Sequence, residues 1–498
     1  MLKVKIISVP NLGAGLMNQC SKQGNKTKIE KSFITLTLVL ALGVTIYTLL
    51  FTVNDTYVLL WLLPLGYFFS TLIYYIIFTR TYYNYGVVFI TANIIIFIRY
   101  VVTPFSIVFS SAYSGIGFGP NPSQTSMGLS IILMVFELIS VYFITIFAIS
   151  YYGKRQRLYY KIKNTPVKIL KNKSIVILFM VLTLPIIIIL SPDSLIPNNL
   201  SSIGEKSNFI SDIPFSGAIL LIIPALRLCF LFISLSLLRK MYEKSNKPIP
   251  MIMAWVIVIL YLSILISTSR WIIIFSSILC MLVMASLFPK TPKIFYGILI
   301  AATSTIFASI SIYKFSWALK SSLNPYKDIL TVLFGQFQEY FSGPRVVAQA
   351  IDMADLYGNR IGITTLINDF MGSVPLVSNL IDQSDRVNVY FNLYLDVGNV
   401  SHIIPMLGNS YAYFPYFPVV FMLISQWLMV RFDYKSRNEQ YIEFKYIYAY
   451  LGLFFAMSMG FNVQIIFGNF LSYFLLPWLI FTINRKVTMK RSADNENL

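Results

Sequence analysis

Residues 128–152 read GLSIILMVFELISVYFITIFAISYY and carry one charge, at Glu137. A run of about 20 apolar residues is long enough for a helix to cross the hydrocarbon core of a bilayer. Backbone groups in lipid need hydrogen-bond partners within the segment, which favours a helix over an open strand. The next loop, 153–173, holds eight Lys and Arg and no acid. This order predicts a membrane helix whose end faces the cytoplasm.

The same alternation of apolar runs and basic loops extends along all 498 residues. The chain is 57% hydrophobic and 12% charged, whereas ordinary soluble domains carry about 25% charged residues. We therefore expect an all-α, polytopic integral membrane protein with about twelve transmembrane helices. The expected spans are 33–53, 56–79, 86–109, 128–152, 174–190, 214–238, 250–267, 271–287, 294–313, 411–430, 446–460 and 464–483.

The net charge of +19 would suit a nucleic-acid-binding protein, but its distribution indicates otherwise. If the N-terminus is cytoplasmic, 29 of the 39 Lys and Arg fall in the termini and loops on that one side. Such a bias sets membrane orientation. It predicts a cytoplasmic basic N-terminus (1–32), a cytoplasmic tail (484–498) and no nucleic-acid partner. Residues 1–32 have no signal-peptide pattern, so the first helix is expected to direct its own insertion.

The loops also divide the chain into regions. A nine-helix membrane region (33–313) and a three-helix region (411–483) flank one long polar excursion, 314–410, expected outside the cell. The excursion holds eight of the twenty acidic residues and the single histidine, His402. Its many apolar residues argue against disorder.

Within the excursion, apolar residues recur at helical spacing in 321–341 and 344–357. Helix breaks are expected at Gly343-Pro344 and Gly358-Asn359. We therefore expect short helices folded over the outer mouth of the bundle, some of them in the membrane interface.

Ionisable residues at membrane depth are costly and functional by default. The apolar runs contain Arg99, Glu137 and Arg227, and Arg270 lies at the outer turn between two spans. The structural alternative is a buried pair of Glu137 with Arg99 or Arg227. For Arg270 the alternative is snorkelling to the interface.

Three further arginines, Arg345, Arg360 and Arg386, lie in the excursion. Guanidinium groups stay charged and hold phosphate oxygens in a bidentate manner. Arginines at the mouth of an apolar bundle indicate an amphiphilic ligand with an anionic head, such as a lipid-linked phosphate or diphosphate.

His402 is a candidate base because histidine titrates near neutral pH. Glu339 and Asp396 compete for the same role. The pairs Asp352/Asp355 and Asp382/Asp385 have D-x-x-D spacing, for which solvated helix faces are favoured over metal ligation. Cys20, Cys229 and Cys280 lie far apart, so they predict neither a disulfide framework nor a metal site. No P-loop, G-x-S-x-G, H-E-x-x-H or dinucleotide motif is present.

Several local stretches of the excursion resemble the oligosaccharide repeat-unit polymerases of the Wzy type, which build O-antigen or capsular polysaccharide. The similarity covers about 335–410 together with the Ser269-Arg270 turn. The stretches are Tyr340-Phe341-Ser342-Gly343-Pro344-Arg345, Gly362-Ile363-Thr364-Thr365, Asn388-Val389-Tyr390-Phe391, Asp396-Val397-Gly398 and Ile403-Ile404-Pro405-Met406-Leu407-Gly408-Asn409-Ser410.

The resemblance implies a GT-C-like glycosyltransferase in the bacterial cytoplasmic (inner) membrane. Its substrate would be an oligosaccharide repeat unit linked to undecaprenyl diphosphate, and a chain-length regulator protein is the usual partner of such enzymes. A diphosphate leaves as a stable anion, so fixed positive charge can serve without a metal cofactor. We expect Arg270, Arg345 and His402 to be catalytic. We expect substrate contacts from Arg99, Arg227, Arg360, Arg386, Glu339 and Asp396.

Two other functions remain open. A flippase for the same lipid-linked oligosaccharide would also have about twelve helices and intramembrane arginines, but it gains little from a large one-sided excursion. A related ligase, such as an O-antigen ligase, would use similar donor chemistry on a different acceptor.

Overall fold

Helices make up most of the part of the chain that the computed structural model describes. An isolated parallel bridge between Lys168 and Tyr441 is the one β contact among these residues. The all-α expectation is therefore confirmed for them. The structure describes residues 12–78, 86–115, 119–159, 167–170, 173–190, 216–245, 247–263, 270–320, 325–374, 377, 381–396 and 402–496.

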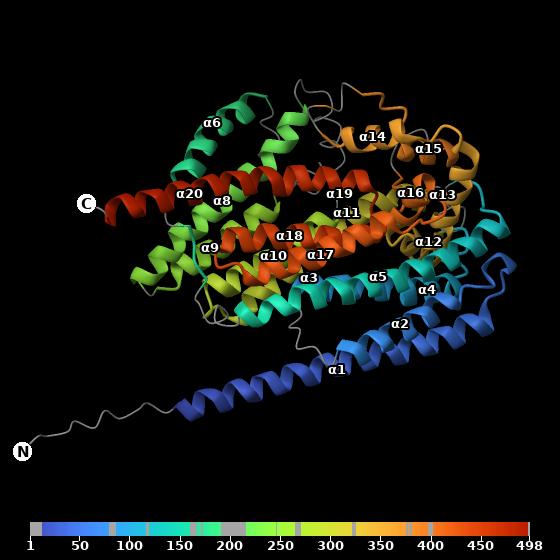
Figure 1. Cartoon of the computed structure of the whole chain (residues 1–498), viewed down its shortest axis with the longest axis horizontal. Helices are drawn as coiled ribbons and strands as arrows, with labels where there is room; N and C mark the ends of the chain where they lie inside the picture. Colours follow the sequence, from blue (N-terminus) through green and yellow to red (C-terminus); the bar gives the residue numbers. More distant parts are fainter. Residues whose placement is uncertain are drawn as a thin grey trace, which may run out of the picture.

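Most of the long helices run side by side along the longest axis of the molecule (Figure 1). The helices on either side of the excursion are α1 (Leu12–Phe51), α2 (Leu62–Phe78), α3 (Val87–Phe97), α4 (Thr103–Phe109), α5 (Gln124–Tyr159), α6 (Ser174–Leu190), α8 (Ser216–Ser245), α9 (Ile249–Ser263), α10 (Arg270–Leu287), α11 (Lys293–Lys320), α17 (Val420–Asn438), α18 (Ile442–Ala456), α19 (Val463–Asn469) and α20 (Leu476–Glu496). Short 3-10 helices, η1 (Asp55–Tyr57) and η6 (Ser458–Gly460), and π-helical turns, η2 (Ile98–Val102) and η7 (Phe470–Leu475), adjoin them.

Six helical stretches among the described residues are long and apolar enough to cross a bilayer, which supports a membrane protein. They are Ser32–Phe51, Asp55–Ile77, Val87–Phe109, Gln124–Tyr152, Leu221–Ser245 and Val463–Val487, and each overlaps an expected span. Four shorter apolar helices, Ser174–Leu190, Ile249–Ser263, Trp271–Leu287 and Lys293–Ser309, lie at four more.

The two remaining expected spans, 411–430 and 446–460, differ from the structure. Residues 411–430 are not one helix, because the chain leaves the helical path between Tyr413 and Val420. Pro415 and Pro418 lie in this break, where proline removes backbone donors and disfavours helix in the residue before it. The span expected at 446–460 is α18, which starts earlier and is buried along nearly its whole length. A helix that is apolar all round belongs at the centre of a bundle.

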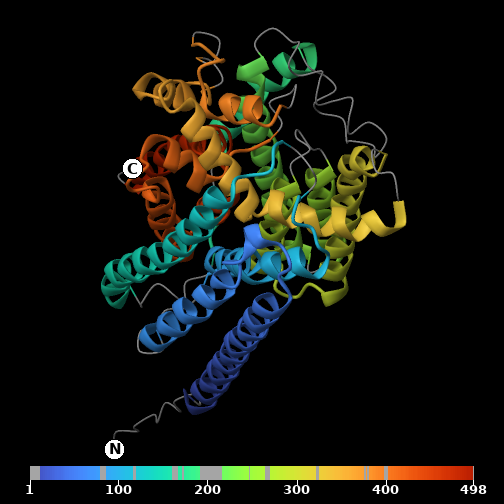
Figure 2. The same cartoon turned by 90° about the vertical axis from the view of Figure 1, so that its right-hand side faces the viewer.

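The excursion gathers at one end of the bundle, which we call the excursion end, opposite the C-terminus (Figure 1). Seen from that end, α12 lies across the bundle (Figure 2). The short helices expected there are present. They are α12 (Pro325–Tyr340), α13 (Pro344–Tyr357), α14 (Ile363–Met371), α15 (Val387–Tyr394) and α16 (Met406–Tyr413).

The placement of α13 differs from the expected cover over the mouth. Ten of its residues are buried, and the helix packs against α5 and α16. Its cap is local: Gly343 precedes Pro344 at the first helical position, where the missing N–H of proline costs nothing. The excursion therefore inserts part of itself into the core, and this fixes the residues at its first turn.

Candidate functional site

The turn between α12 and α13 brings two of the expected site residues together. Ser342 has a positive φ of 50°, and the Gly343 N–H donates to the Gln338 carbonyl at 2.7 Å. A Cβ at Gly343 would lie 3.0 Å from the Gln338 Cα, so this turn favours glycine. The reversal places Arg345, in the first turn of α13, beside Glu339, in the last turn of α12.

Arg345, Glu339 and His402 form what we call the Glu339 cluster. Arg345 Nη1 lies 3.7 Å from Glu339 Oε1, and His402 Nδ1 lies 4.0 Å from Glu339 Oε2. The Arg345 side chain is only 1% exposed, whereas those of Glu339 and His402 are 15% and 16% exposed. The Glu339 carboxyl group thus lies between a buried guanidinium group and an imidazole that is partly exposed to solvent.

Helix α15 positions His402 through two asparagines one turn apart. The Asn392 amide clamps the His402 backbone from both sides: its Oδ1 accepts from the His402 N–H at 3.0 Å, and its Nδ2 donates to the carbonyl at 2.8 Å. Asn388 Oδ1 accepts from the Ile404 N–H at 3.0 Å and from Asn462 Nδ2 at 3.2 Å. The sequence analysis named Asn388 only within a stretch that carries the resemblance and missed Asn392, although their i, i+4 spacing was an available signal.

Removing this clamp is expected to weaken the site. The substitution Asn392→Leu leaves the His402 backbone groups without their partners, at about 1–3 kcal/mol for each buried group left unpaired. We expect about a tenfold loss of the activity proposed below, since imidazole placement governs proton transfer. The measurement compares the reaction rates of Asn392→Leu, His402→Ala and the double variant. If Asn392 acts through His402, the double variant should be no slower than His402→Ala alone. A slower double variant would contradict that role.

A glycine-rich segment between the third and fourth expected spans closes the cluster from the other side. Gly115 has a φ of +58°, and a Cβ there would lie 3.2 Å from Glu339 Oε1 and 3.4 Å from Arg345 Nη1. The Gly119 carbonyl accepts from Arg345 Nη2 at 3.4 Å. The sequence analysis overlooked this segment, although glycines at 115, 117 and 119 were a signal for close backbone approach.

The electrostatics of the Glu339 cluster favour proton movement near neutral pH. Burial raises the pKa of Glu339 to about 7, although the nearby Arg345 charge acts to lower it. Burial, and then the charge of Arg345, lower the pKa of His402 below its ordinary value. At neutral pH the imidazole is therefore neutral and can accept a proton, and the carboxyl group next to it is close to its midpoint.

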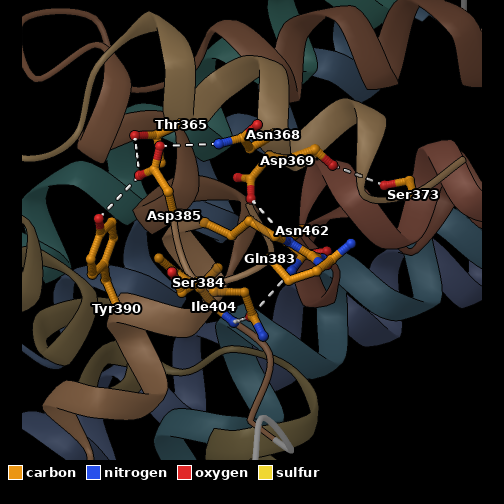
Figure 3. Close-up of polar contacts among 12 residues, drawn as sticks. Thr365, Asn368, Asp369, Ser373, Gln383, Ser384, Asp385, Tyr390, Ile404 and Asn462 are labelled. Atoms are coloured by element: carbon orange, nitrogen blue, oxygen red, sulfur yellow. Dashed lines mark hydrogen bonds and ion pairs between the residues drawn. The ribbon is translucent and has the colours of Figure 1, made fainter. Parts of the chain in front are cut away.

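Arg386 belongs to a second polar group, centred on Asp369, which Figure 3 shows near Asp385. Arg386 Nε lies 3.9 Å from Asp369 Oδ1. Asp369 Oδ2 accepts from the Tyr413 hydroxyl at 2.9 Å and from Asn409 Nδ2 at 3.5 Å. Burial raises the pKa of Asp369, although these partners act to lower it. The sequence analysis did not single out Asp369 or Tyr413.

In each D-x-x-D pair, one aspartate accepts hydrogen bonds from other helices of the protein. Asp385 accepts hydrogen bonds from Thr365, Asn368 and Tyr390 at 2.8–3.0 Å (Figure 3). Asp352 accepts from Ser126 and from Tyr394. Solvation was thus the wrong interpretation for one member of each pair. Within the described part of the chain, no three His, Cys, Asp or Glu side chains group as metal ligands.

Arg99 lies on the π-helical turn η2 and is fully buried. Its Nη2 lies 3.0 Å from Glu137 Oε2, which also accepts from the Tyr100 hydroxyl at 2.9 Å. Both charged side chains are 0% exposed. This is the structural pair that the sequence left open, and the burial of Arg99 argues against the substrate contact expected from it.

Arg227 lies apart from the Glu339 cluster, among aromatic residues. Its Nη2 donates to the Tyr261 carbonyl, and its guanidinium carbon lies 4.9 Å from the centre of the Tyr261 ring. Its Nε is buried and makes no hydrogen bond to another described residue. No carboxylate in the described part of the chain pairs with Arg227, so the charge is available to an anionic ligand.

The remaining expected residues are not joined to the cluster. Arg360 is exposed and lies 6.0 Å from the Tyr357 ring centre, and Asp396 is exposed at a φ of 53°. Arg270 is the first residue of α10, but its side chain lies outside the described residues. Its neighbour Trp271 packs on the Phe341 ring at 5.7 Å, so the start of α10 adjoins the turn that leads to Arg345.

Together, the buried guanidinium, the carboxyl group and the imidazole can bind an anion and accept a proton within one site. No known family model, curated protein or solved structure matches this chain.

Proposed function

We propose that the protein is a polysaccharide polymerase of the Wzy type. In this proposal it joins repeat units carried on undecaprenyl diphosphate at the outer face of the bacterial cytoplasmic membrane. It would have twelve spans in a GT-C-like arrangement with both termini in the cytoplasm. The charge bias of the loops supports this orientation, and the apolar helices support a lipid-borne substrate.

The observation that carries the proposal is the Glu339 cluster itself. Arg345 and His402 are far apart in the sequence, yet each lies within 4.0 Å of one oxygen of the Glu339 carboxyl group. An anion-binding group and a base on opposite sides of one carboxyl group suit a transfer reaction with an anionic leaving group. A carrier that alternates between two faces releases its substrate intact, so it has no leaving group to stabilise.

The chemistry follows from these roles. A hydroxyl of the acceptor sugar attacks the anomeric carbon of the donor, a new C–O bond forms, and the bond from that carbon to the diphosphate breaks. The hydroxyl proton passes to His402, and the Glu339 carboxylate stabilises the imidazolium. The lipid diphosphate leaves with the electron pair, and Arg345, with Arg270 as a further cation, stabilises its negative charge.

This mechanism predicts a distinctive pH profile. His402 must be neutral and Glu339 charged, so the rate should fall as pH falls through about 7, the pKa of Glu339. Below that, protonation of His402 adds a second step at a pH under its ordinary value of about 6.5. In Glu339→Gln only the lower step should remain, and its position should change little, because Glu339 is already largely protonated at that pH in the wild type. Rates in membrane vesicles across pH test this, and an unchanged profile in Glu339→Gln contradicts the assigned roles.

Deletion of the gene distinguishes the alternatives. A polymerase-deficient strain should display single repeat units on its surface, because export and ligation still operate. A flippase-deficient strain should lack surface units and accumulate lipid-linked units inside. A ligase-deficient strain should accumulate polymer that is still attached to the lipid. Only the first result agrees with the proposal.

A further inference from the structure

A cavity of about 180 Å³ lies at the end of the bundle opposite the excursion. We call this the basic end, where residues 167–170, the C-terminal halves of α8 and α10 and the junction of α17 and α18 meet. Among its lining residues, Val167, Leu170 and Leu287 are apolar, whereas Ser236, Arg239 and Lys240 are polar or charged. One side of the cavity is therefore apolar and the other carries charged and hydroxyl groups.

The wall formed by residues 167–170 is held by specific contacts. The Lys168 N–H donates to the Gln440 carbonyl at 2.9 Å, and its carbonyl accepts from the Ile442 N–H at 3.0 Å. The buried Glu443 accepts from the Leu170 N–H at 3.0 Å. Residues 167–170 are thus fixed against the start of α18 by hydrogen bonds. This wall of the cavity is therefore a defined part of the fold.

The charges around the cavity leave one cation unneutralised. Arg239 is paired with Glu243 at 2.7 Å, but Lys240 makes no ion pair with another described residue. Ser236, one turn before Lys240 in α8, is only 3% exposed and lines the cavity. The other titratable groups nearby are Lys173, whose Nζ donates to the Ile233 carbonyl at 3.4 Å, and Glu443. The lining thus combines a hydroxyl group with a lysine that has no ion-pair partner among the described residues.

We propose that this cavity binds the phosphate of an anionic phospholipid headgroup. Lys240 and the free edge of Arg239 would face the phosphate oxygens, and the Ser236 hydroxyl would donate to one of them. The apolar wall of Val167, Leu170 and Leu287 would cover the glycerol and first methylene groups. Basic pockets between helices at a membrane surface suit such headgroups. The proposal is independent of the polymerase function.

The test uses the full-length protein in a neutral detergent after removal of lipid. Thermal unfolding is measured with added phosphatidylglycerol, with phosphatidylcholine, and with inorganic phosphate alone. We expect phosphatidylglycerol to raise the unfolding temperature, since a ligand of the folded state stabilises it. Lys240→Gln should weaken the apparent affinity about fivefold, the effect expected for one interfacial cation. Ser236→Leu should fill the cavity and abolish binding.

The matched control is Lys244→Gln, on the same helix but outside the cavity lining. Equal weakening by Lys244→Gln and Lys240→Gln would show a diffuse surface attraction and would overturn the proposal. Stabilisation by inorganic phosphate that Lys240→Gln weakens would support the site and show that the phosphate alone suffices. Equal effects of phosphatidylcholine and phosphatidylglycerol would overturn it, because the zwitterionic lipid lacks the net charge that the site selects.

Discussion

Replacement of Arg345 by lysine is expected to reduce polymerisation about 10²–10³-fold, the usual effect of removing one donor that stabilises developing negative charge. Lysine keeps the charge but not the rigid fork of donors, so it cannot contact the leaving diphosphate, Glu339 and the Gly119 carbonyl together. The measurement is the initial rate of polymer formation from lipid-linked repeat units in membrane vesicles, with polymer length followed on gels.

Arg360→Lys is the matched control for Arg345→Lys. Arg360 lies in the same excursion but is exposed on its surface, so the control should retain nearly full activity. Thermal unfolding of both variants in detergent separates a chemical effect from a folding defect. A stable Arg345→Lys protein that makes full-length polymer at the normal rate would remove Arg345 from the proposed mechanism.

The largest effect on stability is expected at the buried pair of Arg99 and Glu137. Glu137→Gln should destabilise the protein by about 3–5 kcal/mol, because it leaves a buried guanidinium without a countercharge. The double substitution Arg99→Met/Glu137→Met should cost much less, since it removes both charges and retains most of the volume. Detergent unfolding of Arg99→Met, Glu137→Met and the double variant gives the coupling energy.

An exposed pair provides the comparison for this prediction. Glu243→Gln, which removes the exposed ion pair with Arg239, should change stability by no more than about 1 kcal/mol. If Glu137→Gln is as stable as the wild type but fails to polymerise, Arg99 and Glu137 serve the substrate and not the fold. That outcome would restore the substrate contact first expected of Arg99.

Much of the candidate site could be anticipated from local sequence, but its geometry could not. Gly343-Pro344 is a strong helix break wherever it occurs, so the start of α13 and the position of Arg345 in its first turn were predictable. That Arg345 and His402 both approach the Glu339 carboxyl group was not predictable, because this depends on how α15 holds His402. Asp369 and Tyr413 were missed because isolated polar residues carry no periodic signal.

The sequence by itself determined the all-helical character, the positions of the apolar helices and the bias of basic residues to one set of loops. These properties depend on neighbouring residues and on solvation, which act before any tertiary contact forms. Only the tertiary structure decided that Glu137 pairs with Arg99 rather than Arg227, that α13 enters the core, and that a cavity forms at the basic end. Each of these depends on segments that are distant in the chain, and their packing sets which charges can meet.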